Sequence, residues 1–335
     1  MRKPTPQLDQ QPLLHQRNLL HQQSPLTRRS LLGAGLGLGA ALALGSTTAS
    51  AATAGTAAPS AGHSAPSAAT RRLHELEREH RARIGVFALN LATGASLLHR
   101  AHELFPICSV FKTLAVGAVL RDLDHDGTQL SRVIHYTEAD VRKSGHTPVT
   151  SQHVADGMTV RALCDASIRY SDNCATNLLL RELGGPPAVT RFCRSLGDPV
   201  TRLDRWEPEL NSAEPGRRTD TTSPYAIART YRRLVLGDAL NGPDRALLTD
   251  WLVRSTTSVE RFRAGLPKDW TVADKSGSGS AYGTSNDVAV AWTPDGTPIA
   301  LAAFTHKPAL PGAPGDIPLI IKTATLMAEA VGGPA

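Results

Sequence analysis

Strand-like segments occur at both ends of the region after residue 70, and a long helical stretch separates them. Near its start, "RIGVFALNL" and "SLLHRA" flank the turn "ATGA" and predict a hairpin. Near its end, "TVADKSGSG", "NDVAVAWTP" and "IALAAFTHK" predict three more strands, the last two joined by an Asp295–Gly296 turn. We expect an α/β (α+β) fold: one antiparallel sheet of about five strands from both chain ends, flanked by helices, with an inserted all-helical subdomain and a cleft between the two parts.

Helical periodicity dominates the region between these strands. A charged helix lies in "SAATRRLHELEREHRA", with Leu73 and Leu76 on one side, and "IPLIIKTATLMAEAVG" closes the chain. Residues 202–223 are the exception because they carry no helical period, and a loop this long inside a compact domain is commonly functional. Further helices are predicted over 109–121, 159–170, 173–183, 187–196, 224–236 and 243–254.

The first 70 residues have a different composition. Residues 1–51 combine "TRRSLL", a Gly-rich apolar run and the small-residue site "ASA", in the order of an export signal. The pair Arg28–Arg29 favours the twin-arginine route, and a chance Arg pair before another export signal is the alternative. The apolar run is too short to span a bilayer, so we expect a secreted protein without a stable membrane anchor. Residues 52–70 predict an Ala/Ser/Pro-rich flexible linker, and 71–335 a folded domain.

Charge and cysteine content exclude some classes of partner and fold. The formal net charge is +6, and much of the basic excess falls within 1–51, so the folded region gives no reason to expect a nucleic-acid partner. The chain has 4 cysteines, at 108, 164, 174 and 193. A domain of this size has enough core to fold without disulfides, so we expect none that contributes materially to stability, with Cys164 and Cys174 the only plausible pair.

The segment "CSVFKTLAVGAVL" places Ser109 and Lys112 in an otherwise apolar helix. A spacing of three stacks the two side chains on one side of the helix. In one interpretation Ser109 caps the helix and Lys112 extends its ammonium to water. In the other they are a nucleophile and its activating partner, because burial favours the neutral amine that can accept a proton.

Three later motifs carry polar groups suited to the same chemistry: "SDN" at 171–173, "EPELN" at 207–211 and "KSGSG" at 275–279. Each has a purely structural alternative. "SDN" is also a good helix cap, "EPELN" could be a solvated acidic loop, and "KSGSG" could be a strand end that turns toward solvent. The four motifs together, in this order and spacing, resemble the class A serine β-lactamases from about residue 73 to 333. The resemblance implies the β-lactamase/DD-peptidase-like fold.

The resemblance also implies a set of catalytic residues. Ser109 is the nucleophile, and either Lys112 or Glu207, acting through a water, takes its proton. Ser171 relays a proton to the departing nitrogen, and Glu207 with Asn211 holds the water that hydrolyses the acyl-enzyme. The Glu207–Pro208 bond matches the family's cis peptide, and Arg205 with Asp220 matches the ion pair that closes its loop.

Substrate-binding residues follow from the same resemblance. The backbone N–H groups of Ser109 and Ser278 are expected to hold the oxyanion. Two departures from the family are His146, where an aromatic side chain is usual, and Thr284, where some members keep an arginine. Ser276 replaces the commoner Thr and keeps its hydroxyl. The expected substrate-binding residues are Asn173, Asn211, Lys275, Ser276, Gly277, Ser278 and Arg261, of which Lys275, Ser276 and Arg261 bind the substrate carboxylate.

We therefore expect a monomeric hydrolase that opens the amide of small-molecule β-lactam antibiotics and gives resistance, without a metal or cofactor. "DLDHDG" lacks the glutamate that ends a calcium loop, and "HELEREH" has its two histidines six apart, which does not fit a zinc protease. A DD-peptidase or penicillin-binding protein is the first alternative, since it shares the serine and lysine motifs. A non-hydrolysing β-lactam sensor is the second.

Overall fold

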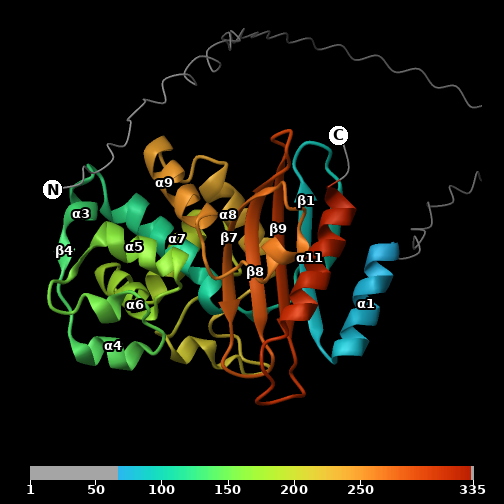
Figure 1. Ribbon diagram of the computed structural model, residues 1–335, viewed down its shortest axis with the longest axis horizontal. Coiled ribbons are helices and arrows are strands. Elements are labelled where there is room, and N and C mark those ends of the chain that lie inside the picture. The colour runs from blue at the N-terminus through green and yellow to red at the C-terminus, as the bar shows by residue number, and fades with distance from the viewer. Residues whose placement is uncertain (1–66, 333–335) are drawn as a thin grey trace, which may run out of the picture. The chain divides into compact units, whose positions relative to one another are not determined.

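Both ends of the chain contribute to one sheet, as the sequence predicts. A computed structural model of the protein describes residues 67–332. Its five-stranded sheet has the order β2-β1-β9-β8-β7, and every neighbouring pair is antiparallel (Figure 1). The expected sheet is confirmed. Its strands are β1 (Arg83–Asn90), β2 (Ser96–His99), β7 (Thr271–Ser278), β8 (Ser285–Trp292) and β9 (Pro298–His306).

Strand β1 pairs with β9, and this pairing joins the strands from the two ends of the chain into one sheet. The eight residues of β1 align with β9 from Arg83 opposite His306 to Asn90 opposite Ile299. In β8, seven of the eight residues are buried, because helices cover both faces of the sheet. This burial explains why residues 288–291 of β8 read as a continuous apolar run rather than as an alternation.

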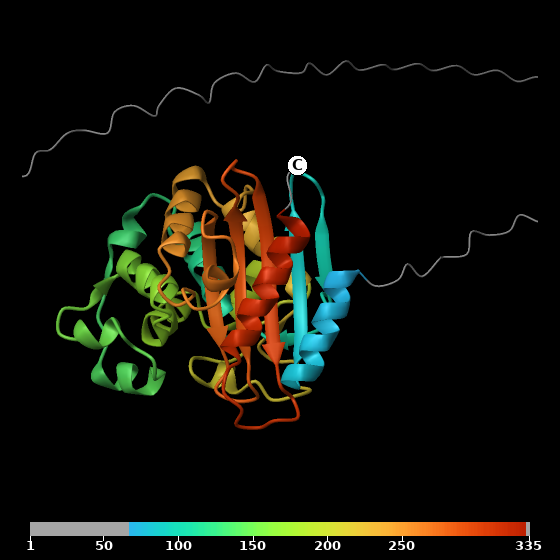
Figure 2. The same cartoon turned by 45° about the vertical axis from the view of Figure 1, so that its right-hand side comes forward.

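Two helices cover one face of the sheet. Helices α1 (Ala68–His80) and α11 (Ile317–Val331) lie side by side there (Figures 1 and 2). Leu73 and Leu76 of α1 are fully buried, as the sequence predicts. Helix α1 starts at Ala68 with Ser67 as its N-cap, so the last three residues of the predicted linker are helical. The predicted export signal and residues 52–66 of that linker lie outside the described residues.

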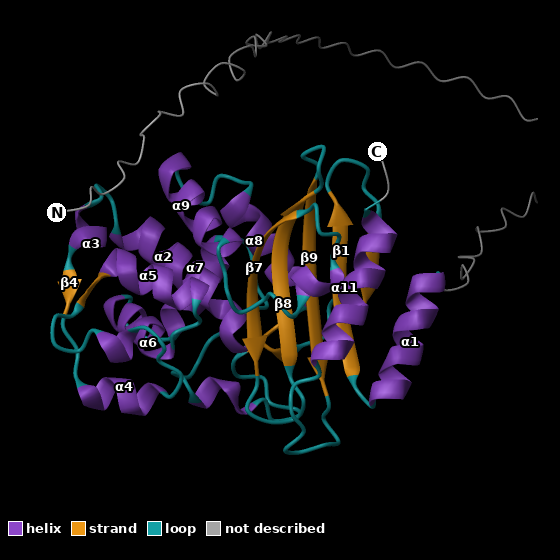
Figure 3. Cartoon of the chain, in the orientation of Figure 1, coloured by secondary structure: helices purple, strands orange, loops and turns teal. Residues whose placement is uncertain are grey.

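The other helices form the predicted helical region beside β7 and on the second face of the sheet (Figure 3). Five of the six lie within one residue of their sequence-based predictions at both ends, and α2 is three residues shorter than its prediction at each end. All seven residues of α2 are buried, as expected for an apolar segment without a polar face. These helices are α2 (Lys112–Ala118), α5 (Val160–Arg169), α6 (Asn173–Glu182), α7 (Pro187–Ser195), α8 (Pro224–Val235) and α9 (Gly242–Val253).

The predicted helix over 109–121 consists of three kinds of turn. A 3₁₀ turn over Cys108–Phe111 precedes α2, and a π turn over Val119–Leu123 follows it. Several short elements have no sequence-based prediction because they span too few residues to show a period. They are α3 (Thr128–Ser131), α4 (Glu138–Ser144), α10 (Phe262–Gly265), the 3₁₀ turns Thr150–Gln152 and Glu209–Ser212, and the strand pairs β3 (Phe105–Pro106) with β6 (Thr221–Thr222) and β4 (Val133–Ile134) with β5 (Met158–Thr159).

Cys108, Cys164, Cys174 and Cys193 are all buried and free. Burial raises the pKa of each thiol, so these cysteines behave as small core residues. Within the described part of the chain, no helix has the length and apolar character needed to cross a membrane.

Candidate active site

Ser109 lies in the 3₁₀ turn that leads into α2, where strand β7 approaches closely. A Cβ atom added to Gly277 of β7 would lie 3.2 Å from the Ser109 nitrogen, so the glycine permits the close approach. The Tyr231 hydroxyl donates to the Val110 carbonyl at 2.6 Å and fixes this turn. Ile107, not Ser109, occupies the N-cap position of the turn, so the capping interpretation of Ser109 is wrong.

Lys112 is completely buried, so the alternative in which its ammonium reaches water is wrong. Its Nζ donates to the Ser171 carbonyl at 2.7 Å, to Asn173 Oδ1 at 2.6 Å and to the Ser171 hydroxyl at 3.2 Å. It also lies 3.2 Å from Glu207 Oε1. Burial lowers the pKa of Lys112, while the Glu207 carboxylate partly opposes the shift. The structure therefore surrounds a buried amine with acceptors and makes its neutral form more accessible.

The "SDN" segment has both a structural and a chemical use. Asp172 caps α6 by accepting from the Ala175 N–H at 2.8 Å, so the capping interpretation holds for this residue. Ser171 has a φ of +56°, a left-handed conformation in which its carbonyl and hydroxyl both accept from Lys112. Asn173, on the first turn of α6, directs its side chain to the same lysine. Capping by Asp172 thus positions the two residues on either side of it.

Glu207 is completely buried, so the alternative of a solvated acidic loop is wrong. The Ser109 hydroxyl donates to Glu207 Oε1 at 3.4 Å, the same oxygen that faces Lys112. The Asn211 side-chain amide donates to the other oxygen, Oε2. The carboxylate is therefore held between the serine, the lysine and the asparagine that the sequence singles out.

Side chains that sequence analysis predicted, and one that it did not, hold the loop that carries Glu207. Asn177 of α6 accepts from the Glu207 N–H at 3.0 Å and donates to the Glu207 carbonyl at 2.9 Å. Arg205 donates to Asp220 at 2.6 Å, the ion pair that the resemblance implies, and the Glu207–Pro208 bond is cis. Sequence analysis did not identify Asn177. Its position four residues after Asn173, on the same side of a helix, is the one available signal.

Strand β7 presents a second group of predicted residues. Lys275 is completely buried and donates to the Ser276 carbonyl at 2.9 Å. Burial, reinforced by the nearby positive charge of Lys112, lowers the pKa of Lys275 to about 7. The Ser276 hydroxyl donates to Thr257 Oγ1 at 2.8 Å, a contact that sequence analysis missed. Both side chains are buried, so the interpretation as a solvent-exposed strand end is wrong for Lys275 and Ser276, whereas Ser278 at the end of the strand is exposed.

Arg261 reaches the end of the same strand. Its guanidinium donates to the Gly277 carbonyl at 2.9 Å and to the Ser278 hydroxyl at 2.6 Å. A longer bond of 3.3 Å reaches the Asn286 carbonyl on β8. Burial lowers the pKa of Arg261. Arginine remains charged in proteins, so this contact brings a second cation to the end of β7.

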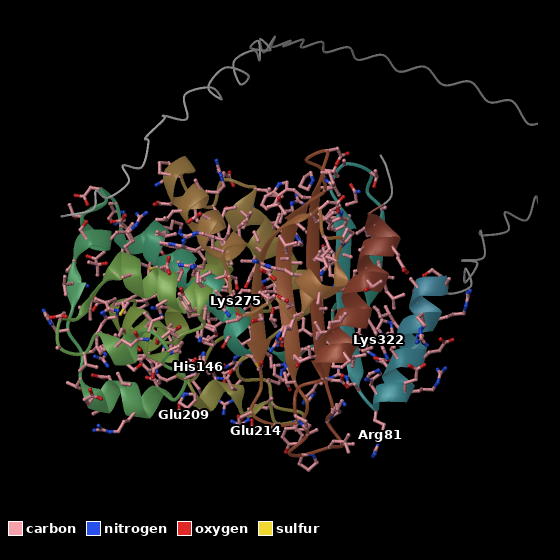
Figure 4. All side chains as sticks on the ribbon, in the orientation of Figure 1. Arg81, His146, Glu209, Glu214, Lys275 and Lys322 are labelled. Carbon is pink, nitrogen blue, oxygen red and sulfur yellow. The ribbon has the colours of Figure 1, made fainter. Side chains whose placement is uncertain are left out.

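The catalytic and substrate-binding residues that the sequence predicts form two groups. The groups meet where β7 approaches the 3₁₀ turn that carries Ser109. Besides the close approach at Gly277, the Ser280 N–H just after β7 donates to the Asn211 carbonyl at 2.8 Å. Figure 4 labels Lys275 on the β7 side and His146 on the helical side. His146 is exposed, with its Nε2 3.1 Å from the Tyr170 carbonyl oxygen. We call Ser109, Lys112, Ser171, Asn173, Glu207 and Asn211 the helical wall, and Arg261 with Lys275, Ser276, Gly277 and Ser278 the strand wall.

Known proteins share this architecture over most of the chain. The β-lactamase enzyme family matches residues 68–329. A β-lactamase from Streptomyces cellulosae is 78% identical over 279 residues, which are 82% of this chain and 90% of that protein. The solved β-lactamase from Streptomyces albus G has 60% identity and a TM-score of 0.78, and covers 79% of this chain and 100% of its own. A variant of the last common ancestor of Gram-negative bacteria β-lactamase class A has 48% identity and a TM-score of 0.74, over 78% of this chain and 97% of its own.

The sheet, the helical region and the serine beside a buried lysine and glutamate define a protein of the serine β-lactamase class. The chain belongs to the β-lactamase enzyme family, as a class A serine β-lactamase.

Proposed function

We propose that this chain hydrolyses the amide bond of β-lactam antibiotics through an ester on Ser109, and that it thereby gives resistance. The observation that carries the proposal is the buried Glu207 carboxylate, which accepts from Ser109 through one oxygen and from Asn211 through the other. A carboxylate in this position can accept a proton both when the ester on Ser109 forms and when water hydrolyses it.

Acylation begins when Ser109 Oγ attacks the β-lactam carbonyl carbon. The hydroxyl proton passes to Glu207, which already accepts its hydrogen bond, or to Lys112, whose lowered pKa makes the neutral amine available. The C–N bond then breaks, and the departing nitrogen takes a proton through the Ser171 hydroxyl, 3.2 Å from Lys112 Nζ. The N–H groups of Ser109 and Ser278 stabilise the oxyanion, since β7 lies against the Ser109 turn.

Deacylation uses a water held between Glu207 and Asn211. Asn211 Oδ1 is buried and has no hydrogen-bond partner among the described residues, so it can accept from this water. Glu207 takes a proton as the water adds to the ester carbonyl, and Ser109 regains its proton when the ester C–O bond breaks. The Glu207–Asn211 pair distinguishes this hydrolase from a DD-peptidase or a β-lactam sensor, which share the serine and lysine motifs.

The strand wall binds the substrate. Lys275, Ser276 and Arg261 offer two cations and a hydroxyl to the carboxylate of a β-lactam. The Ser278 hydroxyl, already bonded to Arg261, lies at the same end of β7. Asn173 donates to the amide side chain of the substrate from the helical wall. The proposed mechanism requires no metal or cofactor.

The remaining expectations concern the whole chain. Residues 1–51 direct export by the twin-arginine route, which the pair Arg28–Arg29 and the "ASA" site support. Residues 52–66 link this signal to the hydrolase domain, whose first helix starts at Ala68, and the domain acts outside the cytoplasmic membrane as a monomer. Pulse labelling of cells with the Arg28→Lys/Arg29→Lys variant tests the route, and unchanged export would contradict it.

The activity is tested by turnover of a chromogenic cephalosporin with and without EDTA. We expect sustained turnover that EDTA does not change, together with no cleavage of a D-alanyl-D-alanine peptide. A single stoichiometric burst without turnover would indicate the sensor, and peptide cleavage with only slow cephalosporin turnover would indicate the peptidase. Either result overturns the proposed function.

A further inference from the structure

Three metal-ligating side chains meet at the sheet edge opposite the active site. His74 and Glu77 lie one turn apart on α1, and His99 ends β2, the strand at the far edge from β7. Their ligand atoms all lie within 4.8 Å of one another. Helix α1 packs on β2, so the cluster joins the first described helix to the edge of the sheet (Figure 1).

The spacing of these atoms is close to that around a small tetrahedral ion. With metal–ligand distances of about 2.0–2.1 Å, neighbouring ligand atoms lie about 3.3 Å apart. Glu77 Oε1 is 3.3 Å from His99 Nε2, and Glu77 Oε2 is 3.5 Å from His74 Nδ1. The His74 side chain is 47% exposed, so its ring can turn toward the other two ligands.

His99 supplies a second, independent observation. Its side chain is 4% exposed, and Nε2 is buried with no hydrogen-bond partner of acceptable geometry among the described residues. Buried polar atoms nearly always have a partner, so an unsatisfied imidazole nitrogen aimed at a carboxylate marks a place for a ligand. A metal ion would satisfy this nitrogen and the carboxylate together.

Arg100 opposes a cation at this position and limits its affinity. The guanidinium donates to both Glu77 oxygens, at 2.7 and 3.1 Å, and the Ile84 N–H donates to Oε1 at 2.9 Å. The carboxylate thus already has a cationic partner, so Arg100 must move or share it when an ion binds.

We propose that His74, Glu77 and His99 bind Zn²⁺ or a similar borderline divalent ion, with water completing the shell, and that this ion ties α1 to β2. Two imidazoles and one carboxylate are a ligand set that suits zinc and copper better than calcium or magnesium. The site is structural rather than catalytic, because β7 and the residues of both walls lie at the other side of the sheet. Sequence analysis set "HELEREH" aside because its two histidines are six apart, and it did not consider His99.

The test is titration of Zn²⁺ into untagged, EDTA-dialysed full-length protein, followed by isothermal calorimetry. We expect one ion per chain, and an affinity at least about tenfold weaker in His74→Ala, which removes an exposed ligand without disturbing the core. The control His153→Ala removes an exposed histidine of the helical region and leaves the affinity unchanged. Arg100→Gln should strengthen binding, since it removes the competing cation.

Two further measurements distinguish Zn²⁺ binding at His74, Glu77 and His99 from Zn²⁺ binding elsewhere on the protein. Cu²⁺ electron paramagnetic resonance should show two nitrogen ligands in the wild-type protein and one in His74→Ala. Zn²⁺ should raise the thermal midpoint of the wild-type protein but not of His74→Ala, and should leave cephalosporin turnover unchanged in both. Equal Zn²⁺ affinity in wild-type and His74→Ala protein, or no binding at millimolar Zn²⁺, would overturn the proposal while leaving the proposed hydrolase function untouched.

Discussion

The helical wall and the strand wall each contain a buried lysine, and the two lysines differ in what surrounds them. Lys112 has a carboxylate, an amide oxygen, a hydroxyl and a carbonyl within 3.2 Å. Lys275 donates to a backbone carbonyl, and within residues 67–332 neither Lys275 nor Arg261 forms an ion pair. The helical wall thus pairs its lysine with a carboxylate in direct contact, whereas in the strand wall Asp274 and Asp287 act on Lys275 only beyond ion-pair distance.

The different surroundings of the two lysines indicate different roles: proton transfer for Lys112 and binding of the substrate carboxylate for Lys275. Buried charge without a partner is costly, and it persists at sites where a ligand supplies the opposite charge. A β-lactam carboxylate would supply that charge to Lys275 and Arg261, while the acceptors around Lys112 keep its amine and Glu207 in place for proton transfer. Substitutions in the helical wall should therefore affect the chemical steps, and those in the strand wall should affect substrate binding.

The largest effect is expected from Ser109→Ala. Removing the nucleophile removes the acyl-enzyme, and loss of a serine nucleophile of this kind costs about 10⁶-fold in turnover. Intact-protein mass spectrometry after incubation with a penicillin should show an adduct on the wild-type protein and none on the variant. The thermal midpoint of the variant should stay close to that of the wild type. A penicillin adduct on the Ala variant would contradict the assignment of Ser109.

Lys275→Met should lower kcat/KM by about 10- to 100-fold, since a hydrogen bond to a charged group contributes about 1.5–3 kcal/mol. The loss should appear with substrates that carry a free carboxylate and largely vanish with the corresponding methyl esters. Steady-state kinetics on an acid and ester pair measures this difference. An equal loss on both substrates would show that Lys275 acts in the chemistry rather than in carboxylate binding.

The pH dependence of kcat/KM sharpens the same point. In the free enzyme Lys275 has a pKa of about 7, so its ammonium form is lost as the pH rises above that value. For a carboxylate substrate, kcat/KM should fall along an alkaline limb that starts near pH 7. Lys275→Arg keeps the charge and should move that limb to higher pH. A limb in the same place in Lys275→Arg would assign it to another group.

The smallest effect concerns stability. The pKa of Lys275 falls from 10.5 in the unfolded chain to about 7 in the fold, so the unfolded state binds more protons between these values. The cost of burying the charge is therefore greatest below pH 7 and shrinks as the pH rises toward 10.5. Lys275→Met should raise the thermal midpoint at pH 6 by about 2–4 °C for each kcal/mol regained, and by less at pH 9.

The thermal midpoint of Lys112→Met provides the comparison for that of Lys275→Met. Removing this lysine leaves the buried Glu207 carboxylate without its ion-pair partner. Breaking a buried pair from one side is destabilising, so Lys112→Met should gain less stability than Lys275→Met at pH 6, or lose some. Scanning calorimetry of both variants at both pH values tests this order. A larger gain in Lys112→Met would contradict the difference between the two walls.

Periodic patterns allowed the main elements to be predicted from the sequence. The strands are predicted from short apolar runs bounded by turn residues, and the long helices from a period of 3.6 and its buried face. The strand pairs β3–β6 and β4–β5 have two residues in each strand, too few to show a period, and the local signal for α4 is the capping box of Thr137 and Asp140. Ser109 and Lys112 could be paired because a fixed helical spacing relates them.

Contacts between distant segments could not be predicted in the same way. Asn177 bonds to the backbone of Glu207, thirty residues away, and Thr257 binds Ser276 from a loop. Such contacts depend on how the chain folds back, and they leave no periodic signal in one sequence. The same holds for His99, which meets His74 and Glu77 only because β2 pairs with β1 under α1.

The central claim is that Glu207 activates the water that releases Ser109. In Glu207→Gln the amide keeps the shape of the side chain but cannot take a proton, so acylation persists while deacylation falls by about 10²–10⁴-fold. Rapid mixing with a chromogenic cephalosporin should show a burst of one product per enzyme, followed by a nearly flat phase, with the acyl-enzyme visible by mass spectrometry. If acylation and deacylation slow equally and no acyl-enzyme accumulates, Glu207 has no special role in deacylation, and unchanged turnover would exclude it from catalysis.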